Sequence, residues 1–112
     1  MRRRDAAWER IIRAYHDGSA ITVALAGEFD LVTAGPAREA ITFAISEARQ
    51  RLIVDLSEVT FIDSSGLHVL LAVHGLCRDA EPTLTIRPGP PNVHRVFELT
   101  NLVDRLPFET SG

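Results

Sequence analysis

The sequence predicts a single α/β domain with a mixed, mostly parallel sheet of four to five strands and three to four α-helices. Strand-like and helix-like segments alternate along the 112 residues, which is typical of parallel strands joined by helical crossovers. Residues 52–56 are apolar at every position except Asp55, as expected for a central strand whose sheet is covered by helices on both faces. The alternation alone leaves open whether the helices lie on one face or on both.

Length and composition fit one globular domain spanning residues 1–112, with 46% hydrophobic and 24% charged residues. The net charge of −3 argues against a nucleic-acid-binding protein. The only basic run lies at residues 2–4, and we expect residues 1–7 to form a flexible tail. Since no stretch approaches the roughly eighteen apolar residues of a membrane helix, we expect no membrane association and a cytoplasmic location.

A β-hairpin is expected near the start of the chain. Residues 8–15 match both a helical and a strand spacing, whereas Asp17-Gly18 is a turn signal and residues 20–26 alternate with Ile21, Val23 and Leu25 on one side. We interpret the pair as a hairpin whose first strand lies at an edge of the sheet.

The first helix is expected after residues 27–31, which interrupt the alternation. Thr33 is the expected N-cap, and Pro36 is tolerated in the first turn. Helical spacing relates the apolar positions Ala37, Ala40, Ile41, Ala44, Ile45 and Ala48. Their small side chains would let the helix lie close to the sheet.

The central strand leads into Asp63-Ser64-Ser65, three residue types that cap helices. The following helix, from about Ser65 to Arg78, is apolar almost all round, so we expect it to be partly in the core and partly available to a partner. Unpaired N–H groups and the helix dipole at such a start suit a negatively charged oxygen group. A hydroxyl there could carry a phosphate, although the residues alone favour a simple helix cap.

The C-terminal part is expected to add a strand at residues 83–87 and a turn at residues 88–91. Asn92 is the expected cap of a helix with Val93, Val96, Phe97 and Thr100 on one side, and Asn101 fits the left-handed position that ends it. Residues 102–108 are expected to form a last short strand.

No constellation of catalytic residues is visible, so we expect no enzyme. His68 and His74 lie on the helix that Ser64 and Ser65 begin, which prevents them from turning back to activate a serine. The histidines show no metal-ligand spacing, and the absence of lysine excludes a P-loop of the Gly-Lys type. Cys77, the single cysteine, is expected to be a buried structural thiol. We therefore expect no cofactor and no metal.

Three motifs resemble those of STAS domains, in particular those of bacterial anti-sigma factor antagonists (anti-anti-sigma factors). The first runs from Leu52 through Asp63-Ser64-Ser65-Gly66 to Leu67. The second is Gly27-Glu28-Phe29-Asp30 followed by Thr33-Ala34, which looks like the family's Gly-Glu-Leu-Asp motif, and the third, from Asn92 to Leu102, looks like its C-terminal helix. The match covers about residues 19–108, so it is far more specific than any one motif.

The resemblance implies a STAS-like fold and a partner-switching regulator. In that family the antagonist binds an anti-sigma factor, a serine kinase of the histidine-kinase-like ATPase fold, and frees the sigma factor; phosphorylation by the kinase ends binding and a serine phosphatase resets the switch. The acceptor serine maps to Ser65, with Ser64 as the second choice. The implied partner-binding residues are Asp30, Asp63, Ser64, Ser65, Gly66, Leu67 and His68.

Two departures and two alternatives accompany this interpretation. His68 stands where the family often has a small or amide residue, which could alter partner choice, and Asn101 replaces a common glycine. The first alternative is a STAS subunit with a scaffold role in a transport or stress-signalling assembly, without a phospho-switch. The second is a small hydrolase that would lose turnover on serine substitution.

Overall fold

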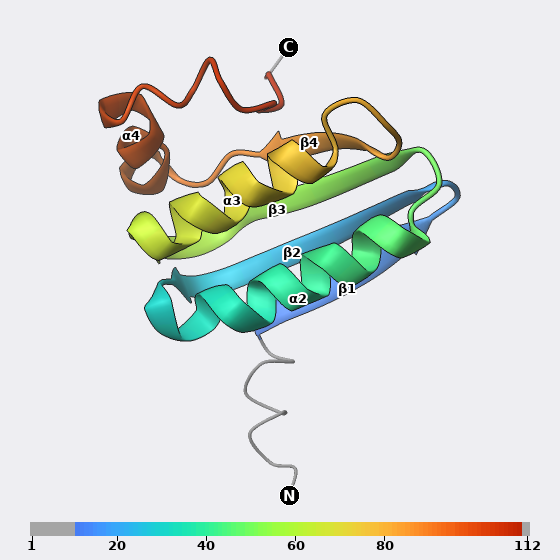
Figure 1. The fold of residues 1–112 in the computed structure, drawn as a ribbon. Helices are drawn as coiled ribbons and strands as arrows, with labels where there is room; N and C mark the ends of the chain where they lie inside the picture. Colours follow the sequence, from blue (N-terminus) through green and yellow to red (C-terminus); the bar gives the residue numbers. More distant parts are fainter. Residues whose placement is uncertain (1–10, 111–112) are drawn as a thin grey trace, which may run out of the picture.

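The computed structural model describes residues 11–110, which build a mixed sheet with helices on both of its faces (Figure 1). The predicted flexible tail at residues 1–7 lies outside this range. Trp8, at the start of the predicted first strand, also lies outside it. The elements in chain order are β1 (Ile12–Asp17), β2 (Ala20–Phe29), α2 (Leu31–Glu47), β3 (Arg51–Ile62), α3 (Ser64–Leu76), β4 (Thr83–Arg87) and α4 (Pro91–Leu99).

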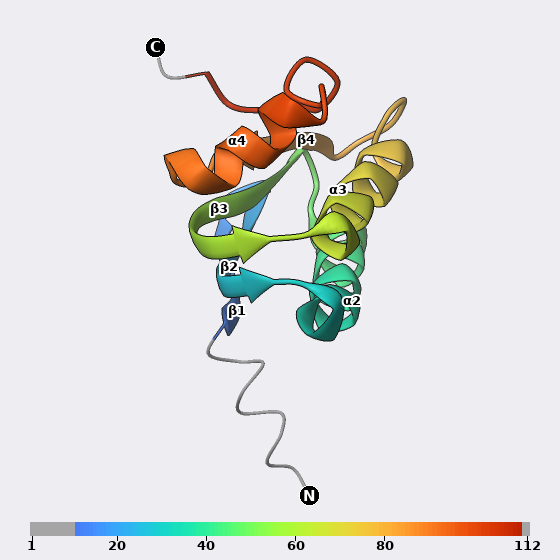
Figure 2. The ribbon, with the colours of Figure 1, turned by 90° about the vertical axis from the view of Figure 1, so that its left-hand side faces the viewer.

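The sheet has four strands in the order β1-β2-β3-β4. β1 pairs antiparallel with β2, whereas β2 with β3 and β3 with β4 pair parallel. Figure 2 shows α2 and α3 on one face of the sheet and α4 on the other. The predicted α/β class, the hairpin and the central position of the 52–56 strand are confirmed, and the helices cover both faces.

The core fills both sides of the sheet: α2 and α3 cover one face, and Val93 and Phe97 of α4 are buried on the other. The inward side of β2 is Ile21, Val23 and Leu25, as predicted, and the paired residues of β3 point to the same side. The largest fully buried side chains are Phe97, Ile41, Leu52, Leu56, Leu70 and Ile86. Because β3 contributes buried residues along most of its length, it is the strand on which the fold is assembled.

β2 is longer than the alternation predicted. It continues beyond Ala26 to Phe29, with register shifts opposite β3 between Ala24 and Ala26 and between Gly27 and Glu28. Gly27 has a φ of 79°, a conformation that glycine adopts without steric cost. The irregular pairing breaks the two-residue period while keeping the strand hydrogen-bonded, and this is why the prediction ended the strand too early.

The N-cap of α2 is Asp30, so the prediction of Thr33 was wrong. The Asp30 carboxylate accepts hydrogen bonds from the amides of Val32 at 3.0 Å and Thr33 at 3.3 Å. The hydroxyl of Thr33 accepts in turn from the amide of Asp30 at 3.0 Å, which completes a capping box. Asp30 and Thr33 are both good capping residues, and the side chain of each accepts a hydrogen bond from the backbone amide of the other.

The earlier start of α2 places Pro36 beyond the first turn, inside the helix, in contrast to the prediction. A residue before proline is normally pushed out of the helical region by a clash that involves its Cβ atom. Gly35 has no Cβ atom, and it therefore allows the helix to continue through Pro36.

β3 extends from Arg51 to Ile62, so the expected link through Phe61 and Ile62 is part of the strand. The helix expected from about Ser65 to Arg78 is α3, which begins at Ser64 and ends at Leu76. Its N-cap is Asp63, the first of the three cap-forming residues Asp63-Ser64-Ser65. The C-cap residue Cys77 is buried, which confirms the prediction of a structural thiol, and burial raises the pKa of that thiol.

Two C-terminal predictions were wrong. The N-cap of α4 is Pro90, and Asn92 lies inside the helix, where its side-chain amide donates a hydrogen bond of 3.1 Å to the carbonyl oxygen of Thr60. The predicted last strand is reduced to a single bridge between Ile86 and Phe108. Phe108 instead packs edge-on against Phe97, with ring centroids 4.9 Å apart. Asn101 ends the helix region with a φ of 61°, as predicted.

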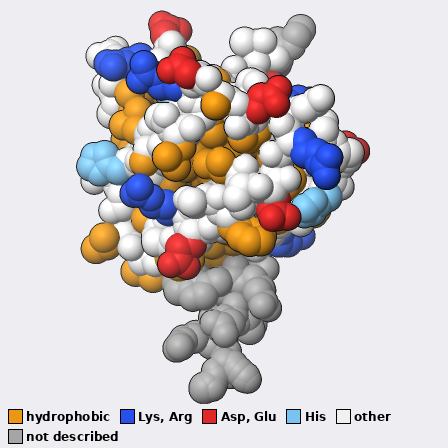
Figure 3. Space-filling view, turned by 45° about the vertical axis from the view of Figure 1, so that its right-hand side comes forward, with side chains coloured by type: hydrophobic (Ala, Val, Ile, Leu, Met, Phe, Trp, Pro, Cys, Tyr) orange, Lys and Arg blue, Asp and Glu red, His pale blue; other side chains and the backbone are white. Residues whose placement is uncertain are grey.

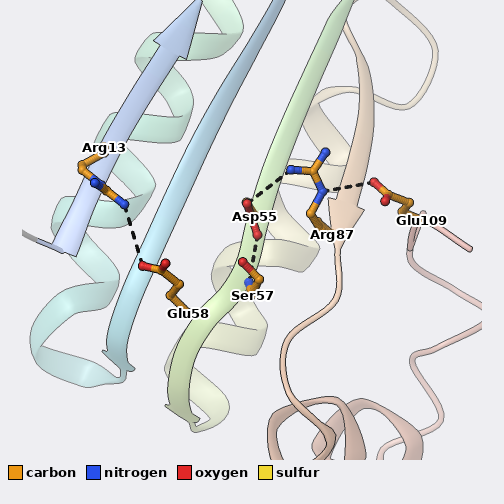
Figure 4. Close-up of polar contacts among 6 residues, drawn as sticks. All are labelled: Arg13, Asp55, Ser57, Glu58, Arg87 and Glu109. Carbon is orange, nitrogen blue, oxygen red and sulfur yellow. Dashed lines mark hydrogen bonds and ion pairs between the residues drawn. The ribbon is translucent and has the colours of Figure 1, made fainter. Parts of the chain in front are cut away.

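Asp55, the polar exception in the central strand, is paired on the α4 side of the sheet (Figure 4). Arg87 on β4 donates to its carboxylate at 3.3 Å and to Glu109 at 3.3 Å. The Asp55 side chain is only 16% exposed, so it needs this partner. A second ion pair, Arg13 with Glu58 at 3.7 Å, crosses over β2 and is well exposed.

Within residues 11–110, no helix is long and apolar enough to span a bilayer.

Candidate functional site

The candidate site lies where β2 and β3 end and α2 and α3 begin. Phe29 and Ile62 are paired across the parallel strands, so the next residues, Asp30 and Asp63, occupy equivalent positions. Each aspartate is the N-cap of the helix that follows it. Figure 1 shows the two helix starts side by side at one end of the molecule. The structure therefore brings Asp30 and Asp63 to the same end of the sheet, as the motifs implied.

Asp63 organises the first turn of α3. Its carboxylate accepts hydrogen bonds from the backbone amides of Ser65 at 2.8 Å and Gly66 at 3.4 Å. Its own amide donates to the carbonyl oxygen of Phe29 at 3.3 Å, which joins this turn to the end of β2. The backbone of Ser65 is thus held by the side chain of Asp63, and the backbone of Asp63 is itself tied to the end of β2.

The two serines differ in accessibility. Ser65 is half-buried, whereas Ser64 is exposed. Within the described residues, neither hydroxyl is engaged in a hydrogen bond. Ser64 and Ser65 are the first two residues of α3, whose dipole favours negative charge at this end. A covalently attached anionic group on either hydroxyl would lie at this end of the helix.

Gly66 allows α3 to begin directly against β2. A Cβ atom at this position would lie 2.8 Å from the carbonyl oxygen of Phe29 and 2.9 Å from Cγ1 of Ile62. Because both neighbours are packed in place, no other residue fits without moving the helix. Gly66 and the neighbouring Leu67, which is 8% exposed, are buried. Both were predicted to belong to the partner-binding surface, and the structure places both beneath it.

The remaining predicted surface residue of α3, His68, is exposed in the second turn of the helix. Asp30 is half-buried, since its carboxylate is occupied by the capping box. Of the predicted site residues, Ser64 and His68 are therefore exposed, whereas Asp30, Asp63 and Ser65 are half-buried.

Three exposed apolar residues at this end were missed by sequence reasoning. Leu31 and Val32, the first two residues of α2, are 78% and 69% exposed, and Phe61, near the end of β3, is 50% exposed. The prediction of Thr33 as the N-cap places Leu31 and Val32 in a linker. With Asp30 as the cap, the same residues are apolar positions in a helical first turn, where polar residues are usual.

Within residues 11–110, no group of three or more His, Cys, Asp or Glu side chains is arranged to hold a metal ion. The features that the site does offer are two free hydroxyls on a fixed turn, acidic caps and an apolar border. These features suit protein recognition and covalent modification.

Comparison with protein families gives one match over nearly the whole chain. The family model described as "Mlab, STAS domain" matches residues 12–107. Among proteins of assigned function, the chain is 32% identical over 88 residues to the anti-sigma-B factor antagonist of Listeria monocytogenes, covering 79% of this chain and 77% of that protein. It is 41% identical over 59 residues to the anti-sigma-F factor antagonist RsfB of Mycobacterium tuberculosis, covering 53% of this chain and 48% of that protein.

Solved structures have the same architecture. An anti-sigma factor antagonist from Mycobacterium paratuberculosis superimposes with a TM-score of 0.80 and 27% identity, covering 89% of this chain and 85% of that one. The anti-sigma factor antagonist SpoIIAA in its unphosphorylated form gives a TM-score of 0.72 at 20% identity, covering 89% of each chain. The phosphorylated form of the Bacillus protein SpoIIAA gives 0.66 at 20% identity, covering 89% of this chain and 92% of that one. At 20% identity, the similarity to the two SpoIIAA structures supports the fold alone.

Proposed function

Because this chain belongs to the STAS domain family and is related to anti-sigma factor antagonists, we propose that its unphosphorylated form binds an anti-sigma factor and thereby releases a sigma factor. The proposed partner is a serine kinase of the histidine-kinase-like ATPase fold. It phosphorylates Ser65, and this modification ends binding. A serine phosphatase resets the switch. The domain itself acts as a binding module in the cytoplasm and catalyses no reaction.

The observation that carries this proposal is the placement of Ser65. The residue lies in the first turn of α3, its amide is held by Asp63 at 2.8 Å, and its hydroxyl has no hydrogen-bond partner among residues 11–110. A kinase that docks on this end of the sheet would meet a hydroxyl with a defined position. Ser64 is more exposed and is the second choice of acceptor.

The expected effect of the phosphate is electrostatic. A phosphoryl group adds about −1.5 to −2 charges, which takes the chain from −3 to roughly −5. The start of α3 compensates by about 0.3 to 1 kcal/mol, so folding should survive. At a closely packed interface, repulsion and desolvation of about 3 kcal/mol correspond to about a hundredfold loss of affinity. Release of the partner therefore requires no refolding of the domain.

The test is phosphorylation by purified candidate kinases with ATP, followed by mass spectrometry to locate the phosphate. We expect one phosphate on Ser65 in the wild type and none in Ser65→Ala, which should still bind the kinase. Ser64→Ala is the matched control and should be modified normally. A phosphate on another residue, or no phosphate with any kinase that binds, contradicts the proposal.

A second candidate function is a scaffold or regulatory subunit of a transport or stress-signalling assembly. It is favoured by the description of the matching family model, "Mlab, STAS domain", which does not refer to sigma factors. In this case Ser65 would serve only in docking. A stable complex with a transporter ATPase that is insensitive to Ser65→Asp would favour this function over the first.

A further inference from the structure

The first turn of α2 presents two large apolar side chains that the fold does not use. Leu31 is 78% exposed and Val32 is 69% exposed, whereas the buried positions of the helix begin only at Ala37. The cap of the helix is complete without them, because the Asp30 carboxylate and the Thr33 hydroxyl satisfy the first amides. Neither residue is explained by packing or by capping.

These residues lie at the same end of the sheet as the proposed phosphoacceptor. Asp63 donates to the carbonyl oxygen of Phe29 at 3.3 Å, and a Cβ atom on Gly66 would approach that same oxygen to 2.8 Å. In the sequence, Ser65 lies between these two contacting residues. Since two residues span at most about 7 Å of chain, Leu31 lies close to the point where α3 touches β2. The apolar pair and Ser65 therefore lie at the starts of two adjacent helices.

Exposed apolar residues also occur elsewhere on the helices. Figure 3 shows hydrophobic side chains gathered on the side of the molecule that carries α2 and α3, and Phe43, near the other end of α2, is 68% exposed. The charge around Leu31 and Val32 sets this pair apart. Glu28, Asp30 and Asp63 lie at the same end, and no lysine or arginine occurs between residues 14 and 37 or between 52 and 77.

We propose that Leu31 and Val32 form an apolar anchor for the anti-sigma factor kinase, with which they select the partner before Ser65 is modified. The anchor fits a partner surface with an apolar pocket bordered by arginine or lysine, because such a border would complement the acidic end of this domain. This inference rests on the proposed function. It divides the contact into recognition at the start of α2 and modification at the start of α3.

The test uses the kinase that phosphorylates wild-type protein on Ser65, and compares three variants. In Leu31→Ser/Val32→Ser the anchor is removed while serine remains acceptable in a helical first turn. In Leu31→Met/Val32→Ile the apolar character is retained. Phe43→Ser removes an equally exposed apolar residue from the distant end of the same helix. Affinity is measured by calorimetry with the kinase alone, and phosphorylation by steady-state kinetics.

We expect the serine pair to weaken binding by about ten- to hundredfold, because anchors at the centre of an interface dominate affinity. KM for phosphorylation should rise by a similar factor, whereas kcat should remain unchanged. The Met/Ile pair and Phe43→Ser should bind as the wild type does, and circular dichroism should show an unchanged fold in all variants.

The inference is overturned if the serine pair binds the kinase like wild type, or if it lowers kcat alone. It is also overturned if Phe43→Ser weakens binding equally, which would indicate a general apolar contact. If no kinase binds or modifies the wild type, the proposed function itself fails, and this result is distinct from the others.

Discussion

The backbone amide of Asp63 donates a hydrogen bond to the carbonyl oxygen of Phe29 across 3.3 Å. This contact joins the residue that caps α3 to the last residue of β2, one position before the cap of α2. The starts of the two helices are therefore parts of one rigid unit, and Ser65 lies on that unit. A charge added at Ser65 would therefore be held on a fixed part of the fold.

Mimicking the phosphate should weaken partner binding. We expect Ser65→Asp to bind the anti-sigma factor about tenfold or more weakly, because it adds a negative charge near Asp63. The expected loss is smaller than that for the phosphate, since a carboxylate carries less charge. Calorimetric titration measures the change. Ser64→Asp is the positional control and should have a smaller effect. Equal affinity of Ser65→Asp and wild type would contradict the switch.

Removing the cap of α3 should destabilise the domain. Asp63→Ala leaves the amides of Ser65 and Gly66 without their side-chain acceptor. We expect the free energy of unfolding to fall by about 1 kcal/mol, within a range of roughly 0.5 to 2, as measured by urea denaturation. Asp63→Asn retains an acceptor oxygen and should remain within a few tenths of wild type. If Asp63→Ala is as stable as Asp63→Asn, the cap has no energetic role.

Gly66 and Gly75 offer a matched pair of substitutions in the same helix. Gly66→Ala forces a Cβ atom to 2.8 Å from a backbone oxygen, and we expect a destabilisation of about 1 to 3 kcal/mol. Gly75 has no heavy atom within 4 Å of an added Cβ, so Gly75→Ala should stabilise the helix by about 0.5 to 1 kcal/mol. Thermal unfolding measures both changes in stability. If both substitutions stabilise the protein, helix propensity and not close packing determines the effect of Gly66→Ala.

The ion pairs of Arg87 and of Arg13 on the α4 side of the sheet should contribute unequally. Arg87→Ala leaves the Asp55 carboxylate, which is 16% exposed, without its cation. We expect a loss of about 1 to 2 kcal/mol, reduced from the value for a fully buried pair because Arg87 itself is 41% exposed. Arg13→Ala breaks a pair at 3.7 Å whose side chains are 52% and 67% exposed, and should cost less than about 0.5 kcal/mol. Similar effects in denaturation experiments would contradict this order.

Cys77 should react slowly with thiol reagents in the folded protein. Burial raises the pKa of its thiol from the usual value of 9.0, so the reactive thiolate is rarer than in an exposed cysteine at the same pH. We expect modification by a chromogenic disulfide at pH 8 to become fast only in denaturant. With the folded pKa above the unfolded one, the stabilisation from the protonated thiol is complete below pH 9 and decreases as the pH rises above it. Fast reaction of the native protein would show that the thiol is accessible.

The central strand and the helix that follows it could be predicted because their signals are local and agree with one another. An apolar run, a cap-forming aspartate and an apolar helix follow in direct succession from Leu52 to Leu76. The family resemblance then pointed to Ser65 as the acceptor, an assignment that remains a prediction. The half-buried position of Ser65 and the burial of Leu67 could not be predicted, because they depend on how closely Gly66 packs against Phe29.

The errors arose where distant contacts decide between equivalent local choices. Asp30 and Thr33 are both good caps, and only the path of β2 determines which one begins α2. Asn92 resembles a cap, but its side chain binds Thr60, which is far away in sequence. The segment after Asn101 has the apolar residues of a strand, but Phe108 uses its ring against Phe97 while its backbone forms a single bridge with Ile86.

The parallel pairing of β2 with β3 also places several connections between elements at the end of the sheet opposite Ser65. The hairpin turn, the link before β3 and the loop before β4 all lie there, where Ser19 donates a hydrogen bond of 3.0 Å to Gln50. A fluorescent dye attached at Arg49, which is exposed in the link before β3, would lie a full strand length from Ser65. Reporter groups can therefore follow the protein in living cells while the helix starts around Ser65 remain unaltered.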